Sequence, residues 1–133
     1  MSCVFCEIVA GRVPASIVHE DERTVTFLDL HPVATGHMLV APRAHAARLA
    51  ELDPEDGAQL FRVGMHAAAA LRAEGVNFFL ADGVVAGHTV FHVHLHVIPR
   101  AAGDGLGFRH GDLVERPRAE LDATAEALRE AWT

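Results

Sequence analysis

The stretch TVFHVHLHVI, residues 89–98, places a histidine at every second position: His92, His94 and His96. These imidazoles alternate with β-branched, aromatic and aliphatic side chains, and Pro99 follows, which predicts a β-strand. Side chains two residues apart on a strand share a face, roughly 6.6 Å from one another. We therefore expect the histidines on one face. That face would also carry Val90 and Ile98, and the opposite face would pack Phe91, Val93, Leu95 and Val97 into the core.

Length and composition indicate one globular domain over residues 1–133. Half of the residues are hydrophobic and 22% are charged, as in ordinary soluble proteins. The formal net charge of −7 argues against nucleic acid as a partner, although a single nucleotide is still possible. The N-terminus does not resemble a signal peptide, and no stretch reaches the length of a membrane span, so we expect a cytoplasmic protein without a membrane partner.

Turn and capping signals divide the rest of the chain into strands and helices. Two short strands are predicted within residues 16–30, a third over 36–42 and a fourth over 76–81. A long helix is predicted to begin at Pro54 and to end before Gly75, and a closing amphipathic helix over 116–133. Strands joined mostly by hairpins, with one long and one terminal helix, predict an α+β fold with an antiparallel sheet.

A Cys-x-x-Cys pair, Cys3 and Cys6, stands at the N-terminus. Such a pair can be a redox motif, half of a zinc site or two incidental thiols. A redox motif is expected after a strand and at a helix start, whereas almost nothing precedes Cys3. Zinc requires two more nitrogen or sulfur ligands, which the chain's 10 histidines can supply.

Three stretches together resemble the histidine-triad (HIT) family of nucleotide hydrolases and transferases. FHVHLHVIPR, residues 91–100, resembles its signature of three histidines separated by apolar residues. CVFCEIVAGRVPASIVHEDERTVTFLDLHPVATGHMLVAPRAH, residues 3–45, resembles the N-terminal half. DGVVAGHTVFHVHLHVIPRAAGDG, residues 82–105, resembles the core. The ordered combination is far more specific than any of the motifs alone.

The resemblance implies a role for each triad histidine. His94 would attack the α-phosphate of a purine nucleoside phosphoramidate or dinucleoside polyphosphate, and water would cleave the nucleotidyl-histidine intermediate. His96 would bind a phosphate oxygen or assist the leaving group. His92 would orient the nucleophile. In members with the cysteine pair, His92 also completes a structural zinc site, whose ligands here would be Cys3, Cys6, His45 and His92.

The same resemblance implies the substrate contacts. Asp29 would accept hydrogen bonds from ribose hydroxyls, and Phe27, Leu28 and Ile8 would line the base site. Gly87 and Thr89 would contact phosphate. His88 stands where the family commonly has a Gln that contacts the bridging or leaving-group oxygen, and a histidine there can still donate one hydrogen bond to substrate. Ala81 stands where many members have Asn or Gln.

Two other functions fit the same residues. The two departures favour a nucleotide-binding or sensing protein with weak or no hydrolysis. A hydrolase that uses the triad as catalytic zinc ligands is the other alternative, although ladder positions on one strand splay their nitrogens apart. By resemblance we expect a homodimer joined through a helix and a strand.

Overall fold

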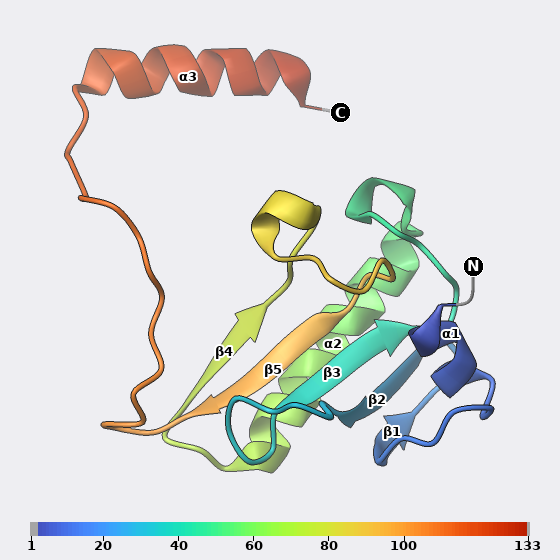
Figure 1. Ribbon diagram of the computed structural model, residues 1–133. Helices are drawn as coiled ribbons and strands as arrows, with labels where there is room; N and C mark the ends of the chain where they lie inside the picture. Colours follow the sequence, from blue (N-terminus) through green and yellow to red (C-terminus); the bar gives the residue numbers. More distant parts are fainter. Residues whose placement is uncertain (1–2, 133) are drawn as a thin grey trace.

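The computed structural model describes residues 3–132, and its centre is an antiparallel sheet (Figure 1). The five strands lie in the order β1 (Ile17–Glu20), β2 (Thr24–Leu28), β3 (Met38–Pro42), β5 (Leu95–Arg100) and β4 (Gly75–Phe79). All neighbouring pairs are antiparallel, which confirms the predicted α+β fold. The histidine-bearing strand β5 is inserted between β3 and β4, so residues from both neighbours reach the site.

Helix α2 (Pro54–Leu71) covers one face of the sheet. It begins as predicted: the Asp53 side chain accepts a hydrogen bond from the Glu55 N–H, and Pro54 occupies the first turn. The helix ends before Gly75 as predicted, but Gly75 was expected directly after it and is instead the first residue of β4, while Arg72 adopts the left-handed conformation at the helix end. A short return to β4 requires that left-handed residue directly after the helix. The core under α2 contains Met38, Val40, Leu60, Val63, Ala67, Val93, Leu95 and Val97.

Helix α1 (Val4–Val9) lies against the opposite face and was not predicted. Cys3 begins it, and the Cys3 Sγ accepts a hydrogen bond from the Cys6 N–H at 3.5 Å. The core on this side is smaller and contains Phe5, Val25, Phe27, Leu39 and Ala41. This face therefore leaves part of the sheet available for a site.

The C-terminal part of the chain extends away from the sheet. An extended segment leads to helix α3 (Arg118–Ala131), which stands apart from β1–β5 and α2 in Figure 1. The closing helix was predicted over 116–133, and Thr133 lies outside the described residues. Leu121 and Leu128 on α3 are exposed, as is Trp132 directly after it. Across residues 3–132, none of the helices is both long enough and apolar enough to cross a membrane.

Candidate functional site

The three histidines of the triad do not share one strand. Residue His96 lies in β5, whereas residues 89–94 are irregular, so the predicted strand over 89–98 is wrong in its first half. The ladder with β3 ends at the Val40–Leu95 pair, and the Val93 N–H donates instead to the Ala46 carbonyl of a loop at 2.8 Å. Phe91 is accordingly 50% exposed and not in the core, where Val93 is buried as predicted.

The His94 imidazole has its tautomer set by the backbone. Its Nδ1 lies 2.7 Å from the His92 carbonyl oxygen, and because that oxygen can only accept, the Nδ1–H donates. The other nitrogen, Nε2, keeps its lone pair. The ring is buried against the edge of Phe5, with ring centroids 4.9 Å apart, and burial lowers the pKa of His94. A neutral imidazole with a free lone pair is the form that can attack phosphorus.

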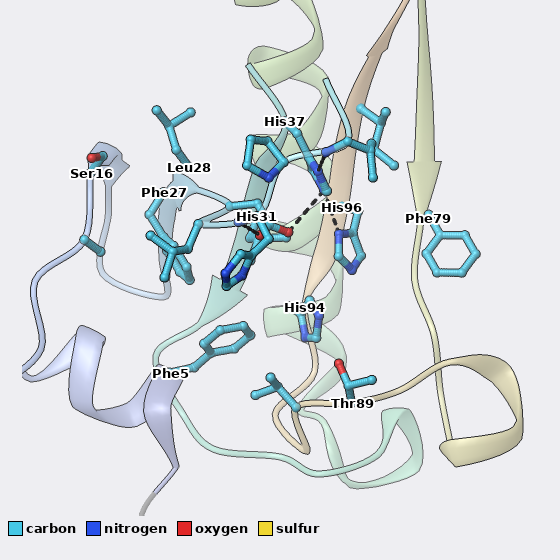
Figure 2. A pocket seen from close by; sticks show the side chains of 18 of the residues that line it. Phe5, Ser16, Phe27, Leu28, His31, His37, Phe79, Thr89, His94 and His96 are labelled. Carbon is cyan, nitrogen blue, oxygen red and sulfur yellow. Dashed lines mark hydrogen bonds and ion pairs between the residues drawn. The ribbon is translucent and has the colours of Figure 1, made fainter. Parts of the chain in front are cut away.

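A fourth histidine, His37, contacts the triad and was missed by the sequence analysis. The Val33 N–H donates to His37 Nδ1 at 3.2 Å, so the His37 proton resides on Nε2. That Nε2 lies 2.8 Å from His96 Nδ1 and 3.5 Å from a carboxylate oxygen of Asp29 (Figure 2). His96 therefore accepts at Nδ1 and carries its own proton on Nε2, where it can donate to a phosphate. The sequence signal that could have identified His37 is its position directly before β3, the strand that pairs with β5.

Burial keeps this pair of imidazoles neutral. Removal from water lowers the pKa of His37, and the Asp29 charge opposes that shift only in part. Burial also lowers the pKa of His96 to about 4, with the neighbouring His94 and His37 rings acting in the same direction. The donor atoms of Asp29, His37 and His96 lie within 4.8 Å of one another, but the 2.8 Å separation of the two rings fits a neutral N–H···N hydrogen bond.

The four predicted metal ligands lie together at the start of α1. His92 Nδ1 is 3.4 Å from Cys3 Sγ, 3.5 Å from Cys6 Sγ and 3.2 Å from His45 Nδ1. Around a tetrahedral zinc ion, with bonds of about 2.0 Å to nitrogen and 2.3 Å to sulfur, two nitrogen ligands lie roughly 3.3 Å apart and a nitrogen and a sulfur ligand roughly 3.5 Å apart. His92 Nε2 lies 2.7 Å from the Pro42 carbonyl oxygen and must donate to it, which leaves Nδ1 bare for a metal. The donor set therefore fits zinc.

This arrangement separates His92 from the rest of the triad. Its side chain is fully buried and turned towards the cysteines, while only its carbonyl reaches His94. In the described part of the chain, the groups of potential metal ligands contain His92 or His96 but not His94. A catalytic zinc shared by all three histidines is therefore not supported by the geometry.

A cavity of about 1550 Å³ opens beside His94 and His96. Figure 2 shows the two histidines facing it, with Phe5, Phe27 and Leu28 along the opposite side. The residues predicted to bind substrate that line it are Ile8, Phe27, Leu28, Asp29, Gly87 and Thr89. The wall is mostly apolar with a few polar groups near the histidines, as small-molecule sites usually are.

The remaining predicted contact, His88, lies behind the cavity wall. It is 3% exposed, and its ring centroid is 6.1 Å from that of His94. The Gly83 N–H donates to His88 Nδ1 at 3.2 Å, which places the His88 proton on Nε2. This buried Nε2–H has no hydrogen-bond partner among residues 3–132. A buried donor without a partner is unusual in a folded protein and requires an explanation.

The model of the HIT domain family matches residues 10–103. This chain belongs to the HIT family. The assignment agrees with the triad and with the Cys-x-x-Cys branch that the sequence indicated. It makes the chain a nucleotide-binding or nucleotide-hydrolysing HIT protein.

Solved structures of HIT proteins resemble the whole chain. A HIT family member from Bacillus subtilis has a TM-score of 0.92 at 33% identity, covering 100% of this chain and 99% of that one. A Zn-bound histidine triad family protein from Mycobacterium smegmatis has a TM-score of 0.77 at 42% identity, covering 98% of each chain. Among characterised relatives, the adenosine 5′-monophosphoramidase of Schizosaccharomyces pombe is 38% identical over 80% of this chain and 81% of its own length.

Proposed function

We propose that this chain is a nucleotidyl hydrolase or transferase that uses His94 to attack the α-phosphate of purine nucleoside phosphoramidates or dinucleoside polyphosphates. The observation that carries the proposal is the hydrogen bond from His94 Nδ1 to the His92 carbonyl, which leaves Nε2 as a free lone pair beside the cavity. The similarity to a fission-yeast adenosine 5′-monophosphoramidase supports phosphoramidates as substrates. We further propose that the chain acts as a single domain in the cytoplasm.

The reaction would proceed in two displacements. His94 Nε2 forms a bond to the α-phosphorus, the bond from phosphorus to the leaving nitrogen or oxygen breaks, and the leaving group takes up a proton from solvent, to which the attacking water of the second step returns one. Water then attacks the same phosphorus, and the bond to His94 breaks to release a nucleoside 5′-monophosphate. His96 Nε2–H would donate to a non-bridging phosphate oxygen throughout, and that oxygen gains charge in each transition state. His92 would hold His94 through its carbonyl.

The cavity offers a place for each part of the nucleotide. We assign Asp29 to the ribose hydroxyls, because its carboxylate lies at the cavity wall and accepts, within residues 3–132, only one backbone hydrogen bond, from His31. The apolar side chains of Phe27, Leu28 and Ile8 would contact the base. Gly87 and Thr89, beside His94, would contact the phosphate.

His88 would act from beneath the phosphate. Its ring centroid is 6.1 Å from that of His94, and its Nε2–H has no partner among residues 3–132, so a phosphate oxygen that reaches it would supply the missing acceptor. If that oxygen is the one that gains negative charge as its bond to phosphorus breaks, the donor binds the transition state more strongly than the bound substrate. Histidine would thereby replace the donor function of the Gln that is common in the family.

We also propose that zinc binds Cys3, Cys6, His45 and His92 as a structural ion. The distances among these donors support this, as does the similarity to a Zn-bound mycobacterial protein. When bound, zinc would fix the irregular segment before β5 to the start of α1. The residues of this segment then hold the carbonyl that orients His94.

The exposed apolar surface supports a homodimer. Strand β4 is an edge of the sheet, and Phe61 and Met65 on α2 are more than half exposed, with the Phe61 ring against Phe78 of β4. The apolar residues of helix α3 are not buried by any other part of the described chain. Apolar surfaces and a free sheet edge of this kind are commonly covered by a second subunit. A molecular mass from light scattering that corresponds to a monomer at micromolar concentration would contradict the proposed dimer.

The His94→Asn variant tests the proposed chemistry. We expect turnover of adenosine 5′-phosphoramidate to fall by at least about 10³-fold, because no other nitrogen replaces Nε2, while AMP affinity stays within about threefold. His66→Asn, an exposed histidine on α2, is the matched control and should retain activity. Rapid quenching with a slow substrate should trap the nucleotide on His94 of the unmodified protein. Undiminished turnover in His94→Asn would refute the assignment.

A nucleotide-binding protein with weak or no hydrolysis is the second candidate. It is favoured by His88 and by the buried Ala81, which supplies no polar contact where many relatives carry an amide. Tight AMP or GMP binding without turnover of phosphoramidates, diadenosine polyphosphates and nucleotidyl sugars would establish it in place of the enzyme.

A further inference from the structure

The chain Asp29–His37–His96 connects the proposed ribose site to the proposed phosphate site. His37 is 3% exposed and contacts both other side chains; Figure 2 shows it beside His96. Its Nε2 is 2.8 Å from His96 Nδ1 and 3.5 Å from Asp29 Oδ2. One proton is thus placed within reach of two acceptors at different distances.

The position of that proton is set by the backbone. Because the Val33 N–H occupies His37 Nδ1, the neutral ring carries its hydrogen on Nε2 and cannot exchange tautomers without losing this bond. Burial lowers the pKa of His37 and of His96, so both rings are neutral near pH 7. The Nε2–H is therefore shared between His96 and the negatively charged Asp29.

A ribose hydroxyl would change how the proton is shared. Asp29 Oδ1 already accepts from the His31 N–H at 2.9 Å, so Oδ2 is the oxygen with capacity for a ligand, and it is also the oxygen nearest His37. A hydroxyl that donates to Oδ2 weakens the attraction of Asp29 for the His37 proton. The bond from His37 to His96 Nδ1 then strengthens, and donation at one imidazole nitrogen makes the opposite N–H a stronger donor.

We propose that Asp29, His37 and His96 form a relay through which a bound ribose hydroxyl strengthens the hydrogen bond from His96 to the phosphoryl group. His37 is the positioning residue of this relay, because it touches neither the substrate nor the phosphorus. The inference rests on the proposed function and adds that the sugar is recognised in the chemical step as well as in binding. Loss of a ribose hydroxyl then lowers kcat in addition to raising KM.

The test is a cycle of substrates and variants on the full chain. The substrates are the 5′-phosphoramidates of adenosine, 2′-deoxyadenosine and 3′-deoxyadenosine. In His37→Asn the amide oxygen can still accept from Val33 N–H, but no donor reaches the position of Nε2. In His37→Gln the amide nitrogen lies near that position and restores a donor. His66→Asn, exposed on α2, serves as control.

We expect the unmodified protein to lose about fivefold in kcat when the hydroxyl that contacts Asp29 is absent, a typical coupling between two sites. In His37→Asn, kcat for the ribose substrate should fall by a similar factor, and removal of the hydroxyl should then affect KM only. His37→Gln should recover part of the kcat preference for ribose. A merely structural role of His37 would lower kcat for all three substrates equally.

The ¹⁵N chemical shifts of the histidine rings give a second readout without turnover. AMP should move the His96 Nδ1 resonance further than 2′,3′-dideoxy-AMP does, and His37→Asn should abolish that difference. A kcat ratio between ribose and deoxyribose substrates that is the same in His37→Asn and the unmodified protein would overturn the relay while leaving the proposed enzyme intact. Failure of the unmodified protein to turn over any substrate would instead overturn the proposed function and the relay with it.

Discussion

Replacing Gly64 with alanine tests how closely α2 must approach the strand that carries the site. Gly64 lies in the middle of α2 and faces Leu95, which separates His94 from His96 in the sequence. A Cβ at Gly64 would lie 2.9 Å from Leu95 Cδ2 and 3.2 Å from Phe78 Cζ. Both distances are shorter than ordinary carbon–carbon contacts of about 3.5–4.0 Å, so the neighbours must move.

Two opposing terms set the expected effect. Alanine is favoured over glycine inside a helix by about 1 kcal/mol. Forcing an extra methyl into a packed core costs about 1–3 kcal/mol. We therefore expect Gly64→Ala to lower the free energy of unfolding by up to about 2 kcal/mol. The Leu95 side chain can rotate, but the Phe78 ring is held by Phe61 at a centroid distance of 5.5 Å, which limits the relief.

Gly57 in the same helix supplies the matched control. A Cβ there meets Leu52 Cδ2 at 3.7 Å, an ordinary contact, so Gly57→Ala should stabilise the protein by about 0.5–1 kcal/mol. Urea unfolding followed by circular dichroism measures both variants. The kcat of Gly64→Ala should also fall, because a displaced Leu95 moves the backbone of His94 and His96. If Gly64→Ala is as stabilising as Gly57→Ala, the close packing of α2 on β5 is refuted.

Three further predictions concern the site. His88→Leu should lower kcat by about 10²-fold, whereas His88→Gln, which keeps an N–H donor, should retain a kcat within about tenfold of the unmodified protein. Equal kcat in the unmodified protein and both variants would rule out a contact between His88 and the substrate. Cys6→Ser should reduce bound zinc, measured by elemental analysis, from about one ion per chain to near zero and lower Tm; unchanged zinc content would contradict the proposed ligand set. The pKa of His96 lies at about 4 in the folded state, below its usual 6.5, so the unfolded chain binds more protons between these two pH values. The free energy of unfolding should therefore fall by roughly 3 kcal/mol as pH drops from 6.5 to 4. In His96→Gln the free energy of unfolding, measured with urea at a series of pH values, should change less between pH 6.5 and 4. An unchanged pH dependence would assign the effect to other groups.

The fold could be predicted because its signals are local. The Pro42 end of β3 and the Asp53–Pro54 start of α2 reflect backbone geometry within a few residues, and both were confirmed. Alternation located the histidine strand only in part, and Pro99, which was expected to close it, lies inside β5. The residue that ends α2 was not predicted correctly, because a residue other than glycine can adopt the left-handed conformation where the connection is short, as Arg72 does here. The site on the α1 face depended on a helix of 6 residues, too short to produce a periodic pattern.

The candidate site was predictable as a set of residues and less so as an arrangement. The alternation of His92, His94 and His96 suggested equivalent positions on one face, yet His92 turns towards the cysteines because residues 89–94 are not paired with β3. Only the family resemblance, with its zinc-ligand pattern, suggested that difference. The contact between His37 and His96 was not predicted, because it depends on the order of the strands in the sheet. Strands β3 and β5 are neighbours although 52 residues separate Pro42 from Leu95.

Backbone groups determine which nitrogen of each imidazole is available for chemistry. A backbone carbonyl accepts a hydrogen bond from His94 Nδ1–H, so the His94 proton stays on Nδ1. In His37 and His88 a backbone N–H donates to Nδ1, so the proton of each ring is on Nε2. The same residue type thus becomes a nucleophile in one position and a hydrogen-bond donor in another. These carbonyl and amide groups belong to irregular segments around residues 33, 83 and 92, which no side-chain pattern specifies. A substitution that shifts one of these segments would therefore change the chemistry of the site while leaving every histidine in place.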